Sequence, residues 1–509
     1  MKYIASPLNV TLRGAILFAH KYLMKVAASV VFSVSSFISL IVMARYVGEA
    51  YGMMMWGMSL VAMFNTTLDI GFHSVNIKKI SEGKDLNKCV STYLAIRIVI
   101  SAVMICLLLM SALLIGDGFP DEFWMVTMVF TLYYVLDNFV LVINGTFIGR
   151  LDAGKESLVL TSTYIVRSAS LIMFAFLGAS AVILSFGYVL GAVCSLAVGY
   201  TLFRSLKVKL VRPVFFREYA SFVLPLALPS ILMSVIAFVD KVLIGAYYGE
   251  LDVAFYTAAT GITFSLVTLG AVMNGLLLSH MTRLNTEGNK DESRNTLWAA
   301  QKYLAVIMLP ATAFLLVFGS ETAVALFGPG FADSGPVLAV LALNIFLAVL
   351  IGMFAQVLFS VGRTGLYGKV AVIYAVFTLT LFLILIPGEL LGLPAGGVGA
   401  AISVVTGNIL FVVLLTFVIK RSGSPGLYPR IYIHVLAAVV VGIMLYAVRT
   451  YLGPENIIWL IVLAIISVAV YSLILAVVRE ITKKDIVFIK ESLDPRNIYE
   501  DLRDEFKGN

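Results

Sequence analysis

Long apolar runs separated by short polar turns recur along this 509-residue chain, and they constrain its fold more than any other feature. A helix needs about 20 apolar residues to cross the hydrocarbon core of a bilayer. Division of the chain at charges, glycines and prolines predicts fourteen such helices. They are centred near residues 35, 63, 105, 135, 168, 192, 232, 267, 311, 347, 378, 408, 440 and 467. Because only 13% of the residues are charged, we predict an all-α polytopic membrane protein.

The basic residues are distributed unevenly over the predicted turns. If the N-terminus is cytoplasmic, nearly all of the 36 Lys and Arg fall on the N-terminal segment, the even-numbered loops and the tail. The odd-numbered loops then hold only Arg45 and Arg449. Because cytoplasmic loops are enriched in Lys and Arg, both termini are predicted to lie in the cytoplasm, with the protein in the cell membrane. The net charge of +7 therefore reports topology, and no nucleic-acid partner is expected.

One stretch of sequence is repeated after 201 residues. The segment "SVVFSVSSFISLIVMARYVGE" (29–49) aligns with "SILMSVIAFVDKVLIGAYYGE" (230–250), with seven of 21 positions identical. Apolar helices can match by composition alone, but the shared Tyr-x-Gly-Glu after each helix favours a duplication. Six spans separate the copies, so the halves have parallel orientation, as in transporters with two repeats. We predict six-helix bundles in 1–212 and 213–425, related by a pseudo-two-fold axis, two further helices in 426–480 and a cytoplasmic tail in 481–509.

Charged residues inside the predicted helices are candidate functional groups, because a charge within a bilayer is costly. The acids are Asp69, Asp137 and Asp240, and the bases are Lys25, Arg97, Arg167 and Lys241. Asp69 and Arg97 lie at similar depth on neighbouring spans, and Asp137 and Arg167 do so as well. Each of these two pairs is either an ion pair that joins helices or part of a functional site.

Asp240 and Lys241 lie near the outer end of their predicted helix, where a lysine can extend to the membrane surface. That interpretation competes with a functional one for both residues. The chain contains no Walker-type glycine loop, no H-E-x-x-H, no G-x-S-x-G and no Cys/His set at metal-ligand spacing. We therefore expect neither an enzyme nor a metal cofactor.

Two turn motifs carry a family resemblance. After the first span stand Ala44, Arg45, Gly48, Tyr51 and Gly52, followed by Asp69, Gly71, Lys78 and Lys79 near the end of the second. The turn after the seventh span has Gly245, Gly249, Ala254 and Tyr256. These motifs and the tail segment 479–490 cover about a sixth of the chain. They resemble the polysaccharide transporter branch of the multidrug/oligosaccharidyl-lipid/polysaccharide (MOP) flippase superfamily.

The resemblance implies a flippase for a polyprenyl-diphosphate oligosaccharide, which crosses from the cytoplasmic to the outer leaflet by alternating access during polysaccharide or surface-glycan biosynthesis. On this hypothesis the diphosphate is bound by three bases, Lys25, Arg97 and Arg167. Asp69 and Asp137 would position these bases or exchange a coupling ion, Na⁺ or H⁺. Asp240 and Lys241 are further candidates at the outer gate. The expected partners of the monomer are the lipid-linked glycan, membrane lipids, and glycosyltransferases or a polymerase.

Two other functions remain open at this point. A cation-coupled multidrug exporter of the same superfamily is one, although such exporters typically have twelve spans and acidic cavities. A non-transporting scaffold of a glycan-assembly complex is the other. A scaffold predicts that variants of the intramembrane charges remain functional, whereas variants of the cytoplasmic loops and tail fail.

Overall fold

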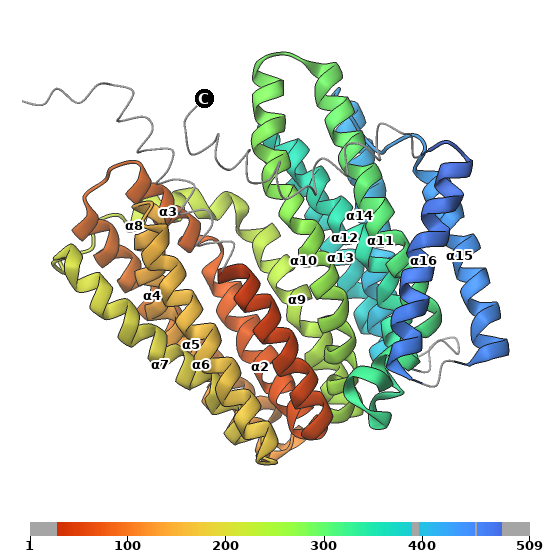
Figure 1. Ribbon diagram of the computed structural model, residues 1–509. Coiled ribbons are helices and arrows are strands. Elements are labelled where there is room, and N and C mark those ends of the chain that lie inside the picture. Colours follow the sequence, from red (N-terminus) through yellow and green to blue (C-terminus); the bar gives the residue numbers. More distant parts are fainter. Residues whose placement is uncertain (1–27, 389–395, 454–455, 481–509) are drawn as a thin grey trace, which may run out of the picture.

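The computed structural model describes residues 28–388, 396–453 and 456–480, and these segments are helical almost throughout (Figure 1). Lys25, the 481–509 tail and most of the turn at 388–397 lie outside the described residues. The long helices are Ala28–Tyr46, α2 (Gly48–Asp69), α4 (Leu86–Ile115), α5 (Asp121–Gly149), α6 (Ala153–Phe176), α7 (Ala181–Phe203), α9 (Ala227–Tyr248), α10 (Glu250–Thr286), α11 (Lys290–Phe327), α12 (Ser334–Ser360), α13 (Thr364–Leu385), α14 (Gly396–Arg421), α15 (Ile431–Leu452) and α16 (Ile457–Val477).

The number of long helices agrees with the predicted fourteen spans. Thirteen helices within the described residues are long and apolar enough to cross a membrane. The remaining predicted span, near residue 63, is α2, whose 22 residues extend over about 33 Å. The predicted tight turn at 177–180 is also present, since α6 ends at Phe176 and α7 begins at Ala181. Gly178 adopts a φ of +64° in this turn, a conformation that favours glycine.

Two short helices were not predicted from the sequence. They are α3 (Phe72–Ser81) and α8 (Phe216–Val223), and each lies next to a spanning helix. Both have polar residues among their apolar ones, so neither produces a run long enough to be recognised as a span. A salt bridge of 3.1 Å between Lys79 of α3 and Glu218 of α8 joins them.

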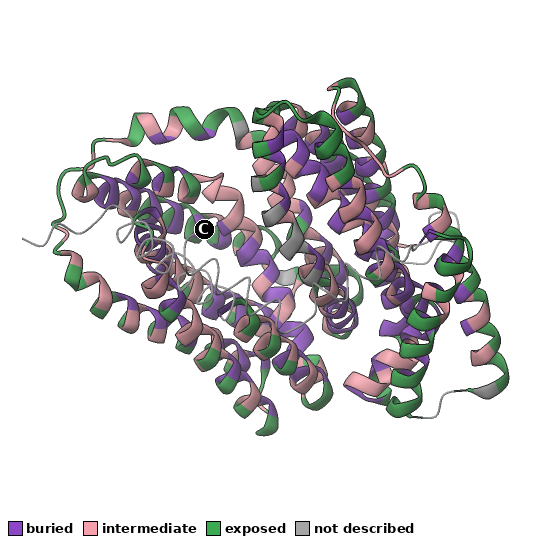
Figure 2. Ribbon diagram, turned by 45° about the horizontal axis from the view of Figure 1, so that its top comes forward, coloured by how far each residue is buried: buried purple, intermediate pink, exposed green. Residues whose placement is uncertain are grey.

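The outer surface of the helix assembly is apolar, as expected for contact with lipid. Figure 2 shows buried positions on the inward sides of the helices and exposed positions on the outward sides. On α16 the exposed apolar residues recur every three to four positions, at Ile458, Ile461 and Ile465. This period places them on one face of the helix, which is the pattern of a helix solvated by acyl chains on that side.

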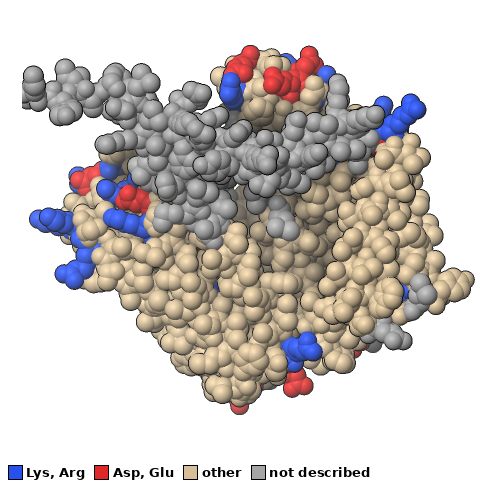
Figure 3. All heavy atoms as spheres, in the orientation of Figure 1, with Lys and Arg blue, Asp and Glu red and all other residues tan. Residues whose placement is uncertain are grey.

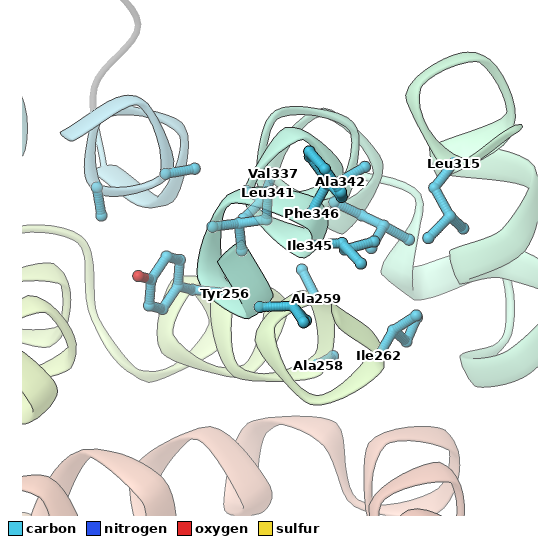
Figure 4. Close-up of a cluster of buried hydrophobic side chains, with 14 of the residues drawn as sticks. Tyr256, Ala258, Ala259, Ile262, Leu315, Val337, Leu341, Ala342, Ile345 and Phe346 are labelled. Atoms are coloured by element: carbon cyan, nitrogen blue, oxygen red, sulfur yellow. The ribbon is translucent and has the colours of Figure 1, made fainter. Parts of the chain in front are cut away.

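The second half of the chain is centred on the contact between α10 and α12, where small side chains permit close packing. Ala258 and Ala259 of α10 are almost fully buried. Ala259 lies toward Leu341 and Ile345 of α12, whereas Ala258 lies on the side of α10 turned away from α12 (Figure 4). Small residues at such a contact increase van der Waals packing between helices in a membrane, where the hydrophobic effect contributes little.

The helices form two groups of six spans and a peripheral pair, which is the predicted fold class. The Ala28–Tyr46 helix and α2–α7 lie together, α9–α14 form the second group, and α15 and α16 pack against α11 (Figure 1). The predicted boundaries at 212/213 and 425/426 fall between α7 and α8 and between α14 and α15.

Candidate functional site

The two ends of the helix groups differ in charge. We call the end that contains the turns 82–85, 150–152, 204–215, 287–289, 361–363 and 422–430 the basic end. Contacts between these turns confirm their proximity, for example Lys155 with Ser205 at 3.1 Å and Arg363 with Ser422 at 2.8 Å. Charged side chains gather along the upper edge of Figure 3, and few lie at the lower edge.

At the basic end, α3 and α8 are joined electrostatically. Glu218 lies 3.1 Å from Lys79 and 3.6 Å from Lys84. The hydrogen bond from Lys79 holds the pKa of the Glu218 carboxyl below its ordinary value of 4.5. The same contact raises the pKa of Lys79 above 10.5. Because α8 precedes α9, this ion pair ties the entrance of the second group to the first.

At the opposite end, glycines allow the two groups to meet closely. A methyl group at Gly52 of α2 would lie 2.8 Å from the carbonyl carbon of Glu250 and closer still to its oxygen. One at Gly245 of α9 would lie 2.5 Å from Nε1 of Trp56 on α2. We call these two contacts the glycine seam. Gly52 and Gly245 belong to the turn motifs of the sequence, so the motifs have a packing role here.

A cavity of about 350 Å³ lies between the two groups, above the glycine seam. It is bounded by the Ala28–Tyr46 helix, α2, α7, α9 and α10. Most of its lining is aromatic or hydroxyl-bearing: Phe32, Ser33, Ser36, Phe37, Tyr51, Tyr188, Thr257, Thr260, Phe264, Ser265 and Thr268. Among the described residues that line it, Lys241 alone carries a charge. The cavity therefore combines apolar surface, hydroxyl groups and one ammonium group.

Lys241 is turned into this cavity and does not extend to the membrane surface. Its side chain is 14% exposed, and its Nζ lies 3.1 Å from Oδ1 of Asp240. The hydroxyl of Tyr256 donates a hydrogen bond of 2.8 Å to the other carboxylate oxygen of Asp240. The interpretation of Lys241 as a residue that reaches the surface is thus wrong, because the buried carboxylate holds the ammonium inside.

Arg167 of α6 lies beside the cavity, among aromatic rings. Its guanidinium carbon is 5.1 Å from the ring centroid of Tyr188, 5.5 Å from that of Tyr164 and 5.9 Å from that of Phe32. Two of these rings, those of Tyr188 and Phe32, line the cavity. Such cation–π contacts stabilise a guanidinium away from water. Arg167 forms no ion pair with Asp137 within the part of the chain described, so the pairing considered for these two residues is not observed.

Arg97 of α4, by contrast, is enclosed by partners inside the first group. It is 1% exposed, and its guanidinium donates to Asp69 at 2.9 Å and to Asn138 at 3.0 Å. Its Nε donates to the hydroxyl of Tyr93 at 2.7 Å. The ion pair between Asp69 and Arg97 that the sequence suggested is therefore present. Because every guanidinium nitrogen has a partner, this arrangement joins α2, α4 and α5.

Asp137 lies next to this network on α5 and is half-buried. Both Arg97 and Arg167 lie within electrostatic range of it. The adjacent Asn138 donates 3.0 Å hydrogen bonds to Asn65 and to Ser101. These amide and hydroxyl groups carry no net charge, so intramembrane charge in the sequence does not point to them.

A second, apolar groove opens beside the central cavity. It has a volume of about 470 Å³ and lies between the Ala28–Tyr46 helix, α10, α11 and α16. Its walls include Val34, Phe314, Leu315 and Val468. The two spaces share the lining residues Ser33, Phe37 and Ser265. The groove and the cavity are therefore adjacent along the Ala28–Tyr46 helix.

Two charged contacts in the second half of the chain were not predicted from the sequence. Glu480, directly after α16, has a side chain only 1% exposed, and it lies 3.5 Å from Arg430 and 3.7 Å from Nε2 of His434. Glu321 of α11 accepts a 2.6 Å hydrogen bond from Arg449 of α15. Both acids stand near helix ends next to other polar residues, so the sequence pattern did not mark them as candidate functional groups.

Comparisons with solved structures identify the fold. The chain superposes on the lipid II flippase MurJ in its inward closed conformation with a TM-score of 0.73, at 14% identity, over 90% of this chain and 99% of that one. An inward-facing multidrug resistance MATE family transporter of the MOP superfamily gives 0.62 at 18% identity, over 76% and 93%. A MOP superfamily transporter from Pyrococcus furiosus, described as having a binding pocket of reverse polarity, gives 0.50 at 16%, over 82% and 99%.

Sequence comparison identifies the family. No curated protein sequence matches the chain. The family model described as "Polysaccharide biosynthesis protein" matches residues 42–336, which is more than half of the chain. The match includes both turn motifs, the glycine seam and the cavity-lining parts of α2, α7, α9 and α10. The chain therefore belongs to the polysaccharide biosynthesis protein family and has the fold of the flippases and transporters of the MOP superfamily.

Proposed function

We propose that this protein moves a polyprenyl-diphosphate oligosaccharide from the cytoplasmic to the outer leaflet by alternating access, for polysaccharide or surface-glycan biosynthesis. The observation that carries this proposal is the Lys241 ammonium group, the one charge on the described cavity wall. The family match and the shared fold with a lipid II flippase support it. The basic end is assigned to the cytoplasm, as are both termini, since Lys and Arg favour that side.

In this proposal the cavity replaces the water around the diphosphate. Lys241 donates hydrogen bonds to phosphate oxygens, and Arg167 adds a second positive charge behind the rings of Phe32 and Tyr188. Charge-assisted hydrogen bonds of this kind are stronger than neutral ones, so they compensate for the lost hydration. The hydroxyl groups of the cavity wall provide further donors for phosphate and sugar oxygens.

The apolar groove is assigned to the lipid tail. Its walls are built mainly from aliphatic and aromatic side chains of the Ala28–Tyr46 helix, α10, α11 and α16. A polyprenyl chain placed there remains in an apolar environment while its headgroup occupies the adjacent cavity.

Not all of the predicted charges keep the same role in this proposal. Arg97 is assigned to stabilising the first helix group together with Asp69, because its donors are already engaged. Lys25 lies outside the described residues and stays a predicted diphosphate ligand. Asp137 and Asp240 are the candidates for coupling to Na⁺ or H⁺, since each is a carboxylate beside the cavity cations.

A cation-exporting multidrug transporter is less consistent with this site. The acid nearest the cavity, Asp240, is turned toward Lys241 and Tyr256 and does not line the cavity wall. A cationic drug would therefore meet an ammonium group first, which is unfavourable.

The proposal is tested by replacing Lys241 and Arg167 singly with glutamine. Each variant should fail to complement a flippase-deficient strain, and lipid-linked glycan should accumulate in the inner leaflet, as measured by mass spectrometry of extracted lipids. Arg283→Gln is the matched control, because Arg283 is 76% exposed at the basic end and its one ion pair within the described residues is with Glu287.

Immunoblots of membranes must show equal amounts of all three variants. Full complementation by both cavity variants would refute the cationic cavity. If loop and tail variants failed instead, the protein would be a scaffold of a glycan-assembly complex, and not a transporter.

A further inference from the structure

The segment that joins α7 to α8 is rich in basic residues and contains no acid. Over positions 204–217 it carries Arg204, Lys207, Lys209, Arg212 and Arg217, all of them exposed. None of these five forms an ion pair within the described residues. Figure 3 shows basic side chains gathered at this corner of the molecule, beside α3 and α8. The acid nearest along the sequence, Glu218, is already engaged by Lys79 and Lys84.

Side chains of α4 anchor the backbone of this segment. The backbone N–H of Lys209 donates to the side-chain oxygen of Asn87 at 2.9 Å, and that of Val211 donates to Ser91 at 2.9 Å. The backbone N–H of Phe215 donates to Thr92 at 3.3 Å. Three anchors along seven residues define where the segment runs, namely along the first two turns of α4.

The length of α4 places these turns at the level of the lipid headgroups. The helix has 30 residues, so it extends over about 45 Å, whereas the hydrocarbon core is about 30 Å thick. Its first turns contain Asn87, Lys88, Ser91 and Thr92, and the remainder is apolar apart from the buried Arg97 and two serines. The polar turns therefore stand outside the hydrocarbon core, and the segment anchored to them lies beside the headgroups.

Apolar side chains alternate with the basic ones along the segment. Leu210 is 69% exposed, Val214 53% and Phe216 43%. In water such exposure would be unfavourable, but at a bilayer surface these side chains enter the boundary between headgroups and acyl chains. Contact with these apolar side chains would not strengthen the binding of a soluble anion.

We propose that this linker patch, formed by Lys207, Lys209, Arg212 and Arg217 with Leu210, Val214 and Phe216, binds anionic phospholipids of the surrounding leaflet. Four bases that form no ion pair within the described residues complement phosphate headgroups, and clusters of four or more Lys and Arg next to a spanning helix favour anionic lipid. Since α8 continues into α9, a lipid bound here fixes the junction between the two helix groups. The inference goes beyond the proposed function and does not depend on the transported substrate.

The test uses purified full-length protein in detergent and native mass spectrometry with added phosphatidylglycerol. The variant Lys207→Gln/Lys209→Gln/Arg212→Gln removes three charges from the patch. The matched control, Arg283→Gln/Lys290→Gln/Arg294→Gln, removes three exposed charges from the ends of α10 and α11 that flank the turn 287–289, at the same end of the protein. All proteins must elute as single species and show equal thermal stability in phosphatidylcholine.

Each basic residue near a membrane surface contributes roughly a fivefold gain in binding, so the patch variant should bind phosphatidylglycerol on the order of a hundredfold more weakly. The control variant should bind phosphatidylglycerol as tightly as the parent protein does. Binding of phosphatidylcholine should be the same for all of the proteins. Equal phosphatidylglycerol binding by parent and patch variant would overturn the proposal, and so would an equal loss in the control.

A second variant separates a lipid from a soluble anion. Leu210→Ser/Phe216→Ser keeps every charge and should still weaken phosphatidylglycerol binding, because the apolar contacts are removed. If this variant binds as the parent does and inorganic pyrophosphate displaces the lipid from both, the patch is a site for soluble anions, and the lipid proposal is wrong.

Discussion

Replacing Gly52 with alanine is expected to open the glycine seam between α2 and α10. The added methyl group would lie 2.8 Å from the carbonyl carbon of Glu250 and 3.0 Å from Cβ of Ala254. Cβ atoms essentially never approach other heavy atoms closer than 3.0 Å, and the Glu250 oxygen is nearer still. The obstacle is backbone, which cannot rotate away as a side chain can. The two helices must therefore separate at this end.

The size of the effect follows from the cost of overpacking. Inserting a methyl group into a close-packed contact costs about 1–3 kcal/mol. Under the proposed alternating access, the contact exists only while the outer end is closed, so this cost falls on one conformation alone. The equilibrium should then shift toward the outward-open state by roughly 5- to 150-fold.

Labelling of a cavity residue from outside the cell measures this shift. Thr260 lines the cavity, so Thr260→Cys in a background without the three native cysteines provides the reporter. A membrane-impermeant maleimide added to intact cells should label this cysteine faster when Gly52 is alanine. The labelling rate, normalised to protein amount, should rise by the same factor as the open population.

Gly57→Ala is the matched control, because it overpacks the same helix without touching the seam. Its methyl group would lie 2.6 Å from Val126 of α5, inside the first helix group. Its labelling rate should equal that of the parent. An unchanged rate in a folded Gly52→Ala protein, or an equal increase in both variants, would refute the idea that the seam controls access.

Two further predictions concern the charged contacts. Arg97→Gln should lower the free energy of unfolding by about 3 kcal/mol. This value is at the low end for a broken buried ion pair, because the Asp69 side chain is 27% exposed. The additional substitution Asp69→Asn should restore part of the thermal stability. The contact between Glu218 and Lys79 should weaken as the pH falls through the lowered pKa of Glu218, which lies below 4.5. The reason is that a carboxyl group with a depressed pKa in the folded state stabilises the fold only while it is ionised. Amide exchange of α8, corrected for intrinsic rates, should then accelerate in the parent but show no such step in Glu218→Gln.

The sequence was sufficient to predict the spans and one of the two ion pairs. Uninterrupted apolar length is a local property, so helices such as α16 could be located without knowledge of their neighbours. Asp69 and Arg97 could be matched because they lie at similar depth on adjacent spans. The environment of Arg167 could not be predicted, since it depends on how α6 and α7 are rotated about their axes. Aromatic rings, and not a carboxylate, surround its guanidinium.

Two kinds of structure were not predicted because hydropathy does not encode them. The helices α10 and α11 have 37 and 38 residues and extend well beyond a bilayer, yet only their apolar parts were recognised as spans. The short helices α3 and α8 have no such apolar part. For the same reason the burial of Glu480 was missed, since it results from packing against His434 and Arg430 at the end of α15.

The adjacency of the apolar groove and the central cavity has an energetic consequence for any lipid that has a polar headgroup and a long apolar tail. Moving a chain from hydrocarbon into water costs about 0.8 kcal/mol for each CH₂ group, so a polyprenyl tail of dozens of carbons could never leave the bilayer on a biological timescale. Because Ser33, Phe37 and Ser265 border both spaces, a headgroup in the cavity and a tail in the groove would need no such transfer. The barrier to crossing would then be independent of tail length and set by the headgroup alone.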